Sequence, residues 1–429
     1  MLSVAKQGRL CWNFPVGKGE VFPVHGAGDG GDERLQRARA PDTMLYKAGR
    51  PGPAGKRCAM AVRTFLIKPA SGMCNMRCRY CFYTDEVQTR SGEPLGLISR
   101  EITRALICKG FSGLSRGDSV SFLFQGGEPT LAGLGYFQYF TDTVDEINTA
   151  RVPVQYAIQS NGLMMDGAWT EFLRDHHFLV GLSLDGTKDL HDNNRVDAQG
   201  RGTWNRAAQS AARLQSKGVS VNFLCVVTKQ LARSPQKVYA TLKKLGGRYL
   251  QFIPCLDPVG APRGAMPYSL LPEEYGHFLC TLFDLWYQDL RQGQCISIRY
   301  FEDLVQMMLG LPPSTCATNG CCGTYYVVEA DGSVYPCDFF ALDEWKMGDI
   351  QRHSLEELDR SQGAVRFMQR SRERLAPCGT CPWSRLCSGG CKRDWHEKDG
   401  IIQNYYCQAF QTFYEYAARR LSLIASSLR

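Results

Sequence analysis

Short apolar runs alternate with longer amphipathic stretches over most of the chain, beginning just after Met60. The short runs are rich in β-branched and aromatic residues, whereas the longer stretches repeat apolar residues at helical spacing. The strands expected from the short runs are Thr64–Lys68, Val120–Gln125, Val154–Gln159, Leu179–Leu184, Val219–Val227 and Tyr249–Ile253. The helices expected between them include Arg100–Lys109, Tyr136–Ile147, Asn205–Lys217 and Pro235–Leu245.

Strand–helix alternation of this kind predicts βαβ units, a parallel sheet and therefore the α/β class. The six expected strands predict a partial (β/α)6, TIM-like barrel rather than a closed barrel of eight strands. In such a fold the active site gathers at the carboxyl ends of the strands. Loops of unusual composition follow four of the expected strands and should meet at that edge, at residues 74–81, 126–129, 160–162 and 185–186.

Further regions follow the barrel, which we place at residues 61–271. A helix-rich bridge at 272–311 leads into a Cys-rich region at 312–409, which is dominated by glycines, cysteines and turns. Within that region, two short apolar runs on either side of Asp331-Gly332 predict a β-hairpin. Residues 410–429 predict an amphipathic C-terminal helix.

Residues 1–60 differ from the rest of the chain because they show no sustained helical or strand period. They hold ten of the 43 glycines together with scattered Arg and Pro, which predicts a disordered segment. Two interpretations stay open. The segment is either a flexible tail or upstream sequence wrongly joined ahead of a true start at Met60, and we favour the second.

Composition and charge narrow the class of protein. A chain of 429 residues with 44% hydrophobic residues can bury a sizeable core, and it contains no apolar run long enough to cross a bilayer. The first residues lack the apolar core of a secretory signal, so we expect a cytoplasmic protein without a membrane partner. Of the net charge of +8, residues 1–60 contribute +5, from ten basic and five acidic residues. The rest is near balance, so a nucleic-acid partner is not expected.

The 19 cysteines are unevenly spread, with three between Cys74 and Cys81 and nine between Cys316 and Cys407. Disulfide scaffolds are short, secreted chains, so clustered cysteines in a long chain without an export signal favour bound metal. The spacing Cys74-x3-Cys78-x2-Cys81 places three thiols on one loop after a strand. Three thiolates can hold three irons of a 4Fe–4S cluster and leave the fourth open, whereas zinc usually takes four ligands.

This loop, followed by Phe82-Tyr83, resembles the cluster-binding motif of the radical S-adenosylmethionine (radical SAM) superfamily. The resemblance implies that the open iron binds S-adenosylmethionine, which one electron cleaves to methionine and a 5′-deoxyadenosyl radical. The segment Gly126-Gly127-Glu128-Pro129 resembles the superfamily's GGEP motif, which contacts the methionine amino group. Its glycines let a backbone approach a ligand closely. The loops at 160–162 and 183–186 are turns in isolation, but in this fold they also line the expected cofactor cleft.

The C-terminal cysteines form two sets with one residue more than two four-ligand sites need. Two zinc sites are one interpretation. However, the spacing Cys378-x2-Cys381-x5-Cys387-x3-Cys391 resembles the SPASM extension of peptide-modifying radical enzymes, whose relatives carry two auxiliary 4Fe–4S clusters. The first set is Cys316, Cys321, Cys322 and Cys337, and the second is Cys378, Cys381, Cys387, Cys391 and Cys407.

A narrower resemblance, to anaerobic sulfatase-maturating enzymes, covers about Met60 to the C-terminus. It implies that the chain oxidises an active-site Cys or Ser of a sulfatase, in a C/S-x-P-x-R motif, to formylglycine (3-oxoalanine). The expected partners are therefore a sulfatase polypeptide and an electron donor such as flavodoxin or ferredoxin. The segments that carry the resemblance are residues 66–74, 124–130, 180–185, 250–257, 297–301 and 331–338.

The resemblance also assigns residues to the three expected 4Fe–4S clusters and to S-adenosylmethionine. The radical-site cluster would be held by Cys74, Cys78 and Cys81. The first auxiliary cluster would be held by Cys316, Cys322, Cys337 and Cys391, and the second by Cys378, Cys381, Cys387 and Cys407. Cys321 is left over. The contacts to S-adenosylmethionine would come from Tyr80, Gly127, Ser183, Arg195 and Leu256.

Asp338 would be the catalytic base, because the substrate must lose a proton after a hydrogen atom leaves its Cβ. Without the resemblance, Asp338 would be interpreted as a turn residue beside a cysteine. Two rival functions remain at this point. One is maturation of a ribosomal peptide by thioether or carbon–carbon crosslinking, which uses the same extension, and the other is a non-catalytic, zinc-rich binding module.

Overall fold

The computed structural model describes residues 61–91, 95–323 and 325–429. Our expectation for the segment at 1–60 therefore lies outside the described residues.

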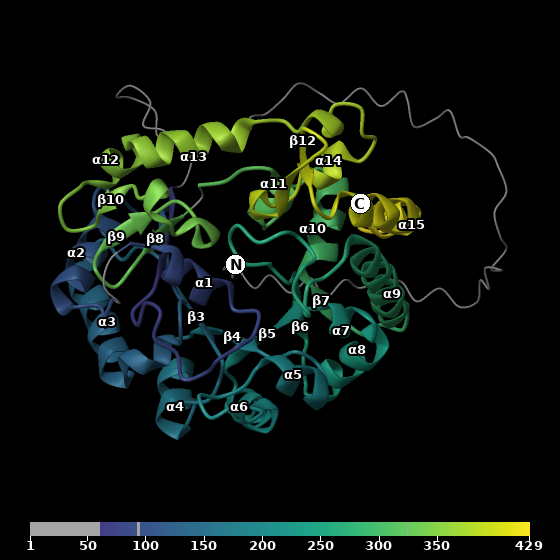
Figure 1. Ribbon diagram of the computed structural model, residues 1–429. Helices are drawn as coiled ribbons and strands as arrows, with labels where there is room; N and C mark the ends of the chain where they lie inside the picture. The colour runs from purple at the N-terminus through teal and green to yellow at the C-terminus, as the bar shows by residue number, and fades with distance from the viewer. Residues whose placement is uncertain (1–60, 92–94, 324) are drawn as a thin grey trace, which may run out of the picture.

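Six parallel strands form the centre of the molecule and confirm the expected α/β barrel (Figure 1). Each strand pairs in parallel with the next along the chain, from β1 to β6. All six lie within two residues of their expected bounds. They are β1 (Val62–Ile67), β2 (Ser119–Phe124), β3 (Val154–Ser160), β4 (Leu179–Ser183), β5 (Ser220–Val227) and β6 (Tyr249–Pro254).

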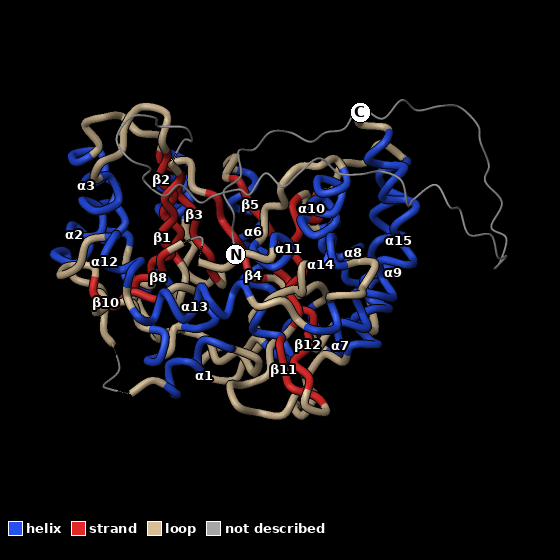
Figure 2. The backbone as a smooth tube through the Cα atoms, turned by 90° about the horizontal axis from the view of Figure 1, so that it is seen from above, coloured by secondary structure: helices blue, strands red, loops and turns tan. Residues whose placement is uncertain are grey.

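Helices cover the outer face of this sheet, as Figures 1 and 2 show. Side-chain oxygens fix two of their starts, since Ser99 accepts a hydrogen bond from the Ile102 amide and Asp166 accepts one from the Trp169 amide. The longer helices are α2 (Arg100–Phe111), α3 (Leu134–Ile147), α4 (Gly167–Asp175), α6 (Trp204–Ser216) and α8 (Pro235–Lys244). Short helices in the loops are α1 (Phe82–Thr89), α5 (Lys188–Asn194) and α7 (Lys229–Ala232).

Aromatic side chains fill the space between the sheet and these helices. Phe122 and Phe124 of β2 are at most 1% exposed, and their rings lie 5.1 Å and 4.8 Å from those of Phe140 and Phe137 of α3. Edge-to-face packing of this kind adds to the stabilisation from buried area. Because helices cover one face and the barrel interior the other, the strands carry apolar residues on both faces, as in β2 (SVSFLF) and β5 (SVNFLCVV).

The expected hairpin is present, and it is joined to the barrel. Strand β8 (Tyr326–Val328) pairs in parallel with β1, and β9 (Ser333–Tyr335) pairs in antiparallel fashion with β8. A short strand, β10 (Gly348–Asp349), extends the edge. One sheet of ten strands therefore runs from β10 through β9, β8 and β1 to β6 and ends at β7 (Ser297–Ile298). It places part of the Cys-rich region directly beside the barrel.

The bridge consists of α9 (Pro272–Arg291) and α10 (Arg299–Met308), with strand β7 (Ser297–Ile298) between them beside β6. The C-terminal helix, α15 (Cys407–Ser426), packs along α9. It begins at Cys407, three residues before the expected start, so that this cysteine occupies a helix N-terminus. A Cβ on Gly276 would lie 3.3 Å from the Ala409 Cα, so the glycine permits close packing of these two helices.

Small elements make up the rest of the Cys-rich region, which lies over one end of the barrel in Figure 1. They are α11 (Cys316–Asn319), α12 (Leu355–Arg360), α13 (Gln362–Arg372), α14 (Ser384–Cys387) and the hairpin of β11 (Trp395–Lys398) and β12 (Ile401–Asn404). Single 3-10 turns lie at Asp338–Phe340 (η3) and Lys392–Asp394 (η6). Within the described ranges, no helix is both long and apolar enough to cross a bilayer.

Candidate functional site

The loop after β1 brings Cys74, Cys78 and Cys81 together at the carboxyl edge of the barrel. Burial raises the pKa of the Cys74 thiol to about 11 and that of Cys78 to about 12, and the nearby Cys81 thiol adds to both rises. Buried thiols of this kind become thiolates when a metal displaces their protons. The Met76 amide, 3.4 Å from the Cys74 Sγ, donates to that sulfur. The donor set therefore fits an iron–sulfur site.

Gly127 holds this loop in place through backbone contacts. Its amide donates to the Ser71 carbonyl at 2.7 Å, and the Glu128 amide donates to the Met73 carbonyl at 2.8 Å. A Cβ on Gly127 would lie 2.0 Å from the Met73 oxygen, so only glycine fits. We expected the glycine to allow close approach to a ligand. The structure shows that its Cα faces the backbone that leads into Cys74.

The Glu128 carboxylate ties the loop after β2 to the loop after β3. It is 1% exposed and accepts hydrogen bonds from the Ser160 hydroxyl and the Asn161 amide, both at 2.8 Å. Burial raises the pKa of Glu128, and these hydrogen bonds partly oppose the rise. The Asn161 side chain in turn donates to the Asn75 Oδ1 at 2.7 Å, next to Cys74. The loop at 160–162 thus supports the cysteine loop.

A buried carboxylate, Asp185, holds two of the predicted cofactor contacts. The Tyr80 hydroxyl donates to it, and the Arg195 Nε lies 2.9 Å from its Oδ2. The guanidinium of Arg195 also lies 5.3 Å from the centre of the Tyr80 ring. Burial alone would lower the pKa of Arg195, but Asp185, Tyr80 and Cys78 together outweigh burial and raise that pKa. Asp185 also accepts from the Val226 amide at 2.9 Å, which fixes it against β5.

The remaining predicted cofactor contacts lie on the same edge. Ser183 is the last residue of β4, and Leu256 follows the end of β6 by two positions. Ser183 is 6% exposed, and Leu256 is half-buried. Four of the five candidate S-adenosylmethionine contacts therefore lie at strand ends or in the loops that follow them. The fifth, Arg195, is joined to the loop after β4 by its hydrogen bond to Asp185.

The thiol neighbours of the C-terminal cysteines fall into two groups. Burial raises the pKa of Cys337, and the nearby Cys316 and Cys322 thiols add to that rise. The pKa of Cys391 is raised by burial and by Asp394, then by the Cys316 and Cys337 thiols. Cys391 thus lies with the first set although it is adjacent in sequence to the second.

The second group consists of Cys378, Cys381, Cys387 and Cys407. Burial raises the pKa of Cys387 to about 12, with smaller contributions from the Cys378 and Cys407 thiols. Burial also raises the pKa of Cys407, which has Cys378 and Cys381 as neighbours. Among the described residues, no three Cys, His, Asp or Glu side chains converge as tightly as one metal ion requires. The ligands of a cluster bind separate irons, so a cluster site does not require that convergence.

Cys321, the leftover residue, is exposed and neighbours Cys316. Its sequence neighbour Cys322 is only partly exposed and lies near Cys337. This difference favours Cys322 as the member of the first set.

Asp338 lies at the junction of the barrel and the Cys-rich region. It is 2% exposed, and its Oδ1 lies 2.7 Å from the Nζ of Lys68, which directly follows β1. These two atoms meet as an ion pair without hydrogen-bond geometry. At 2.5 Å from its Oδ2, the Gln125 side chain, directly after β2, donates to the same carboxylate. The candidate base therefore faces the ends of two barrel strands.

Glu329, in the turn between β8 and β9, makes a second junction that the sequence did not indicate. Its carboxylate is fully buried and accepts from the Ser71 hydroxyl at 2.9 Å and the Tyr83 hydroxyl at 2.7 Å. Arg90, which directly follows α1, forms an ion pair with the Glu329 carboxylate at 2.8 Å. Ser71 and Tyr83 flank the cysteine loop, so Glu329 fixes that loop against the hairpin.

The buried contacts of Lys68 and Glu329 were not predicted. Each residue is a single charge at the end of a short apolar run, where strands commonly end. The available signal was weak: Lys68 continues an apolar run, Phe65-Leu-Ile, without a turn residue. Burial of Lys68 alone would lower its pKa, but Asp338, Tyr83 and Glu329 outweigh that effect and raise it.

Known proteins match this arrangement of barrel, cysteine loop and Cys-rich region. A family model of the radical SAM superfamily matches residues 69–241, and a model of the SPASM iron–sulfur cluster-binding domain matches residues 320–382. Among solved structures, anSMEcpe with bound AdoMet and the Cp18Cys peptide has a TM-score of 0.81 and 39% identity, covering 86% of this chain and 100% of its own. SuiB of Streptococcus suis, bound to the precursor peptide SuiA, covers 77% of this chain and 72% of its own with a TM-score of 0.52 and 16% identity, which shows the fold alone.

Curated relatives are similar over nearly their whole length. A cysteine-type anaerobic sulfatase-maturating enzyme of Clostridium novyi is 41% identical over 85% of this chain and 98% of its own. One from Clostridium perfringens is 40% identical over 85% of this chain and 99% of its own. A serine-type enzyme of Bacteroides thetaiotaomicron is 26% identical over 85% of this chain and 91% of its own.

Fold and site together define a radical SAM enzyme with a SPASM region, whose cofactors are S-adenosylmethionine, a 4Fe–4S cluster and additional iron–sulfur clusters. At the identity and coverage of its curated relatives, the chain belongs to the family of anaerobic sulfatase-maturating enzymes. The expected family, fold class, cofactors and activity class are confirmed, and the rival functions are not favoured.

The Gly127 contact yields a first prediction. We expect Gly127→Ala to displace the backbone before Cys74 and to lower the bound iron by about four atoms per chain, the content of one 4Fe–4S cluster. Iron analysis after anaerobic reconstitution measures the loss. Gly135→Ala is the matched control, because a Cβ at that helix position meets nothing within 4 Å. Full iron content in the Gly127 variant would show that the loop tolerates the shift.

Glu86, in α1, yields a prediction on pH. Its side chain is fully buried, and neither carboxylate oxygen has a hydrogen-bond partner within the described residues. Burial raises the pKa of Glu86 from 4.5 to about 8, although Lys68 and other cations oppose the rise. Between these pH values the folded state holds a proton that the unfolded chain has lost, so stability falls as pH rises through that window.

We therefore expect Glu86→Gln to raise the melting temperature of the reconstituted protein by about 2–5 °C at a pH near 8, and by less at a pH near 5. The isosteric amide removes the cost of ionising a buried carboxyl. Thermal unfolding followed at several pH values measures the difference, with the exposed Glu171→Gln as control. An identical pH dependence in wild type and the Glu86 variant contradicts the prediction.

Proposed function

We propose that this chain oxidises the active-site cysteine of a sulfatase, in a C-x-P-x-R motif, to formylglycine. The observation that carries the proposal is 40–41% identity to cysteine-type enzymes, of which the chain spans 98–99%, against 26–31% identity to serine-type enzymes. A likeness of 16% to a peptide-modifying enzyme supports no second candidate. The proposal includes a one-electron donor such as flavodoxin or ferredoxin and a reducing, cytoplasmic location.

The cysteine groups described above supply the ligands in this proposal. Cys74, Cys78 and Cys81 hold the radical-site cluster, and the two C-terminal groups, with Cys391 in the first, hold two auxiliary clusters. When bound, the reduced radical-site cluster and S-adenosylmethionine supply the 5′-deoxyadenosyl radical that takes a hydrogen atom from the substrate. The residues that position S-adenosylmethionine are Tyr80, Gly127, Ser183, Arg195 and Leu256.

Asp338 accepts the substrate thiol proton in this scheme. The oxidation removes a hydrogen atom from Cβ, a proton from sulfur and an electron, for which the auxiliary cluster that Cys337 would help to hold would be the acceptor. Hydrolysis of the resulting thioaldehyde leaves formylglycine and sulfide. Lys68, 2.7 Å away, balances the charge of Asp338, and Gln125 holds the orientation of the carboxylate. Because Asp338 faces the ends of β1 and β2, proton loss occurs beside the edge where the hydrogen atom is removed.

The substrate preference can be measured directly. The enzyme, S-adenosylmethionine and a reductant are incubated without oxygen with a C-x-P-x-R peptide or its serine counterpart, and the product masses are read. We expect the aldehyde from both, with kcat/KM at least about tenfold higher for cysteine, a difference of roughly 1.4 kcal/mol in transition-state binding. A crosslinked product without aldehyde contradicts the proposed function, and equal rates contradict the cysteine preference.

Iron content tests the ligand assignment. Eleven assigned cysteines should bind about twelve irons per chain, and the triple substitution of Cys74, Cys78 and Cys81 by Ala should leave about eight. Cys322→Ala should lower the iron content of the first auxiliary cluster, whereas Cys321→Ala and the exposed Cys108→Ala should leave the iron content unchanged. Loss of iron in the Cys321 variant but not in the Cys322 variant would reverse that assignment.

Replacing Asp338 separates hydrogen abstraction from proton loss. Asp338→Asn keeps the shape but cannot accept a proton at neutral pH. We expect 5′-deoxyadenosine to form while formylglycine falls by roughly a hundredfold, the scale of losing a positioned base. Chromatography of both products gives their ratio, and Asp343→Asn in the neighbouring turn is the control.

Because Asp338→Asn leaves Lys68 without its counter-charge, a second variant that also carries Lys68→Met removes both charges. Both variants should keep their iron and show the same uncoupling. A wild-type ratio of formylglycine to 5′-deoxyadenosine in either variant shows that the base is another residue.

A further inference from the structure

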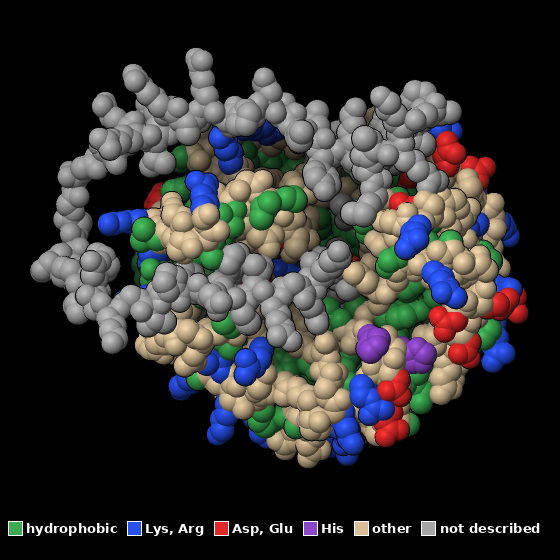
Figure 3. Space-filling view, turned by 180° about the vertical axis from the view of Figure 1, so that it is seen from behind, with side chains coloured by type: hydrophobic (Ala, Val, Ile, Leu, Met, Phe, Trp, Pro, Cys, Tyr) green, Lys and Arg blue, Asp and Glu red, His purple; other side chains and the backbone are tan. Residues whose placement is uncertain are grey.

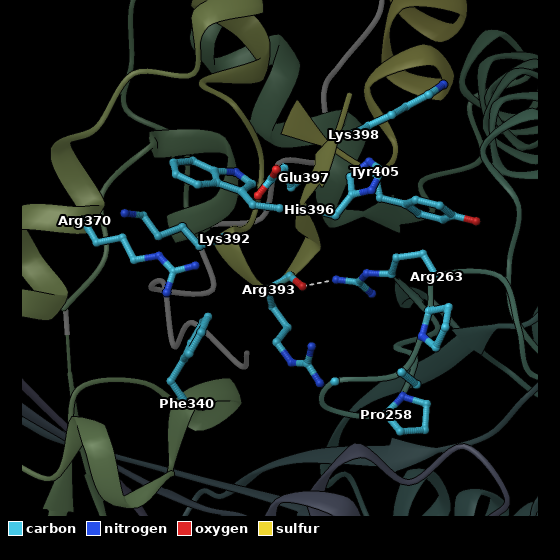
Figure 4. A pocket seen from close by; sticks show the side chains of 14 residues that line it. Pro258, Arg263, Phe340, Arg370, Lys392, Arg393, His396, Glu397, Lys398 and Tyr405 are labelled. Atoms are coloured by element: carbon cyan, nitrogen blue, oxygen red, sulfur yellow. Dashed lines mark hydrogen bonds between the residues drawn. The ribbon is translucent and has the colours of Figure 1, made fainter. Parts of the chain in front are cut away.

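A cavity of about 680 Å³ lies where the loop after β6 meets the Cys-rich region. The loop after β6 contributes Arg263, η3 contributes Phe340, and α13 contributes Arg370. The rest of the wall comes from η6 and the β11–β12 hairpin, including Lys392 and Lys398. Figure 4 shows these side chains around the cavity.

The lining is strongly basic. Glu397 is the single acidic side chain among the lining residues, against five Lys and Arg side chains and His396. On the opposite face of the molecule, by contrast, Figure 3 shows basic side chains standing mostly apart, some beside acidic ones. The basic residues of the cavity are Arg263, Arg370, Lys392, Arg393 and Lys398.

Several of these cations have donors that nothing in the described chain satisfies. The Lys392 side chain is 5% exposed, and its Nζ has no hydrogen-bond partner, although it lies 4.8 Å from the centre of the Trp395 ring. The Arg393 Nε and the Arg263 Nη1 are also buried without a partner. Buried donors of charged groups are costly to leave unpaired, so these atoms favour an anionic acceptor in the cavity.

The walls hold these donors in fixed positions. Arg263 donates through its Nη2 to the Arg393 carbonyl, a contact drawn in Figure 4. The Arg393 Nη2 donates to the Asp257 carbonyl at 3.2 Å. Both arginines thus bridge the loop after β6 and η6, and each has one buried nitrogen without a hydrogen-bond partner in the described chain. Nearby acidic groups offset part of the positive charge without hydrogen-bonding to these nitrogens. Glu86 lies near Arg393, Asp394 near both arginines, and the Cys322 thiol and Glu373 near Lys392.

The cavity lies beside the proposed site of proton loss. Phe340, in its wall, belongs to the same 3-10 turn as Asp338. A polypeptide that presents a side chain to Asp338 therefore has neighbouring residues within reach of the cavity. Carboxylates are the anions that a polypeptide carries, and they pair with Arg and Lys through charge-assisted hydrogen bonds.

We propose that this basic cavity binds an Asp or Glu side chain of the substrate polypeptide, close in sequence to the residue that is modified. The inference rests on the proposed function and adds a specificity element to it. Its effect is on binding of the substrate rather than on the chemical step, because the cations do not contact the reacting atoms.

Peptide binding tests the proposal. A series of C-x-P-x-R peptides carries one Glu, or one Gln, at successive positions on either side of the motif, and binding to the reconstituted enzyme is followed by fluorescence anisotropy without oxygen. At one position or at adjacent positions we expect Glu to bind about fivefold more tightly than Gln, the upper end for a solvent-accessible ion pair. The preference should weaken with added salt.

Enzyme variants then locate the preference. Arg370→Gln combined with Lys398→Gln should reduce it to less than about twofold by removing accessible cations. Arg366→Gln is the matched control, since Arg366 lies on the same helix but contacts Trp345 and Glu344 outside the cavity. The Arg366 control should leave both the Glu preference and kcat at saturating peptide unchanged. Added phosphate at constant ionic strength shows whether a free anion competes for the same cations.

The outcomes are distinguishable from failure of the proposed function. Equal affinity for Glu and Gln peptides at every position, or an equal effect of the Arg366 control, overturns the inference even when formylglycine is made. Absence of aldehyde with any peptide overturns the proposed function, while the binding preference is still measured independently of turnover.

Discussion

The buried ion pair between Lys68 and Asp338 connects the two halves of this molecule. Lys68 follows the first barrel strand and Asp338 follows a cysteine of the auxiliary region, and both side chains are almost completely buried. In a buried pair, the attraction between the two charges offsets the cost of removing them from water. Removal of one partner leaves a buried, unpaired charge and lowers the free energy of unfolding by about 3–5 kcal/mol. The same junction is strengthened by the pairing of β8 with β1 and by the contacts of Glu329 with Ser71 and Tyr83. The auxiliary region is thereby part of the barrel's active edge.

Much of the barrel could be predicted from the sequence because its strands are buried on both faces. Runs such as Val120–Gln125 are apolar at four of six positions, and their ends carry the loops that hold the site. The helices α4, of nine residues, and α5, of seven, were not among those expected, because about two turns show little of the helical period. The pairing of β8 with β1 joins segments more than 250 residues apart, which local patterns do not specify.

The sequence predicts candidate ligands of the site, but it indicates less about the residues that hold the site's loops in place. The cysteine spacing identified the radical site, whereas the placement of Cys391 with Cys316 and Cys337 came from family resemblance and not from its position in the sequence. The contact of Gly127 with the Met73 carbonyl was not predicted, and its role at the cofactor stays a prediction. Lys68, Glu128 and Glu329 act through buried contacts between distant loops, and a single charged residue in a sequence does not reveal its partner.

The central claim is that hydrogen abstraction at the barrel edge and proton loss at Asp338 act on the same substrate residue. A peptide whose reactive cysteine carries deuterium on Cβ tests the first step most directly. The account predicts that each formylglycine is accompanied by one 5′-deoxyadenosine carrying one deuterium, detected by mass spectrometry. Formylglycine accompanied by unlabelled 5′-deoxyadenosine would contradict the account, because the hydrogen atom would then come from another position.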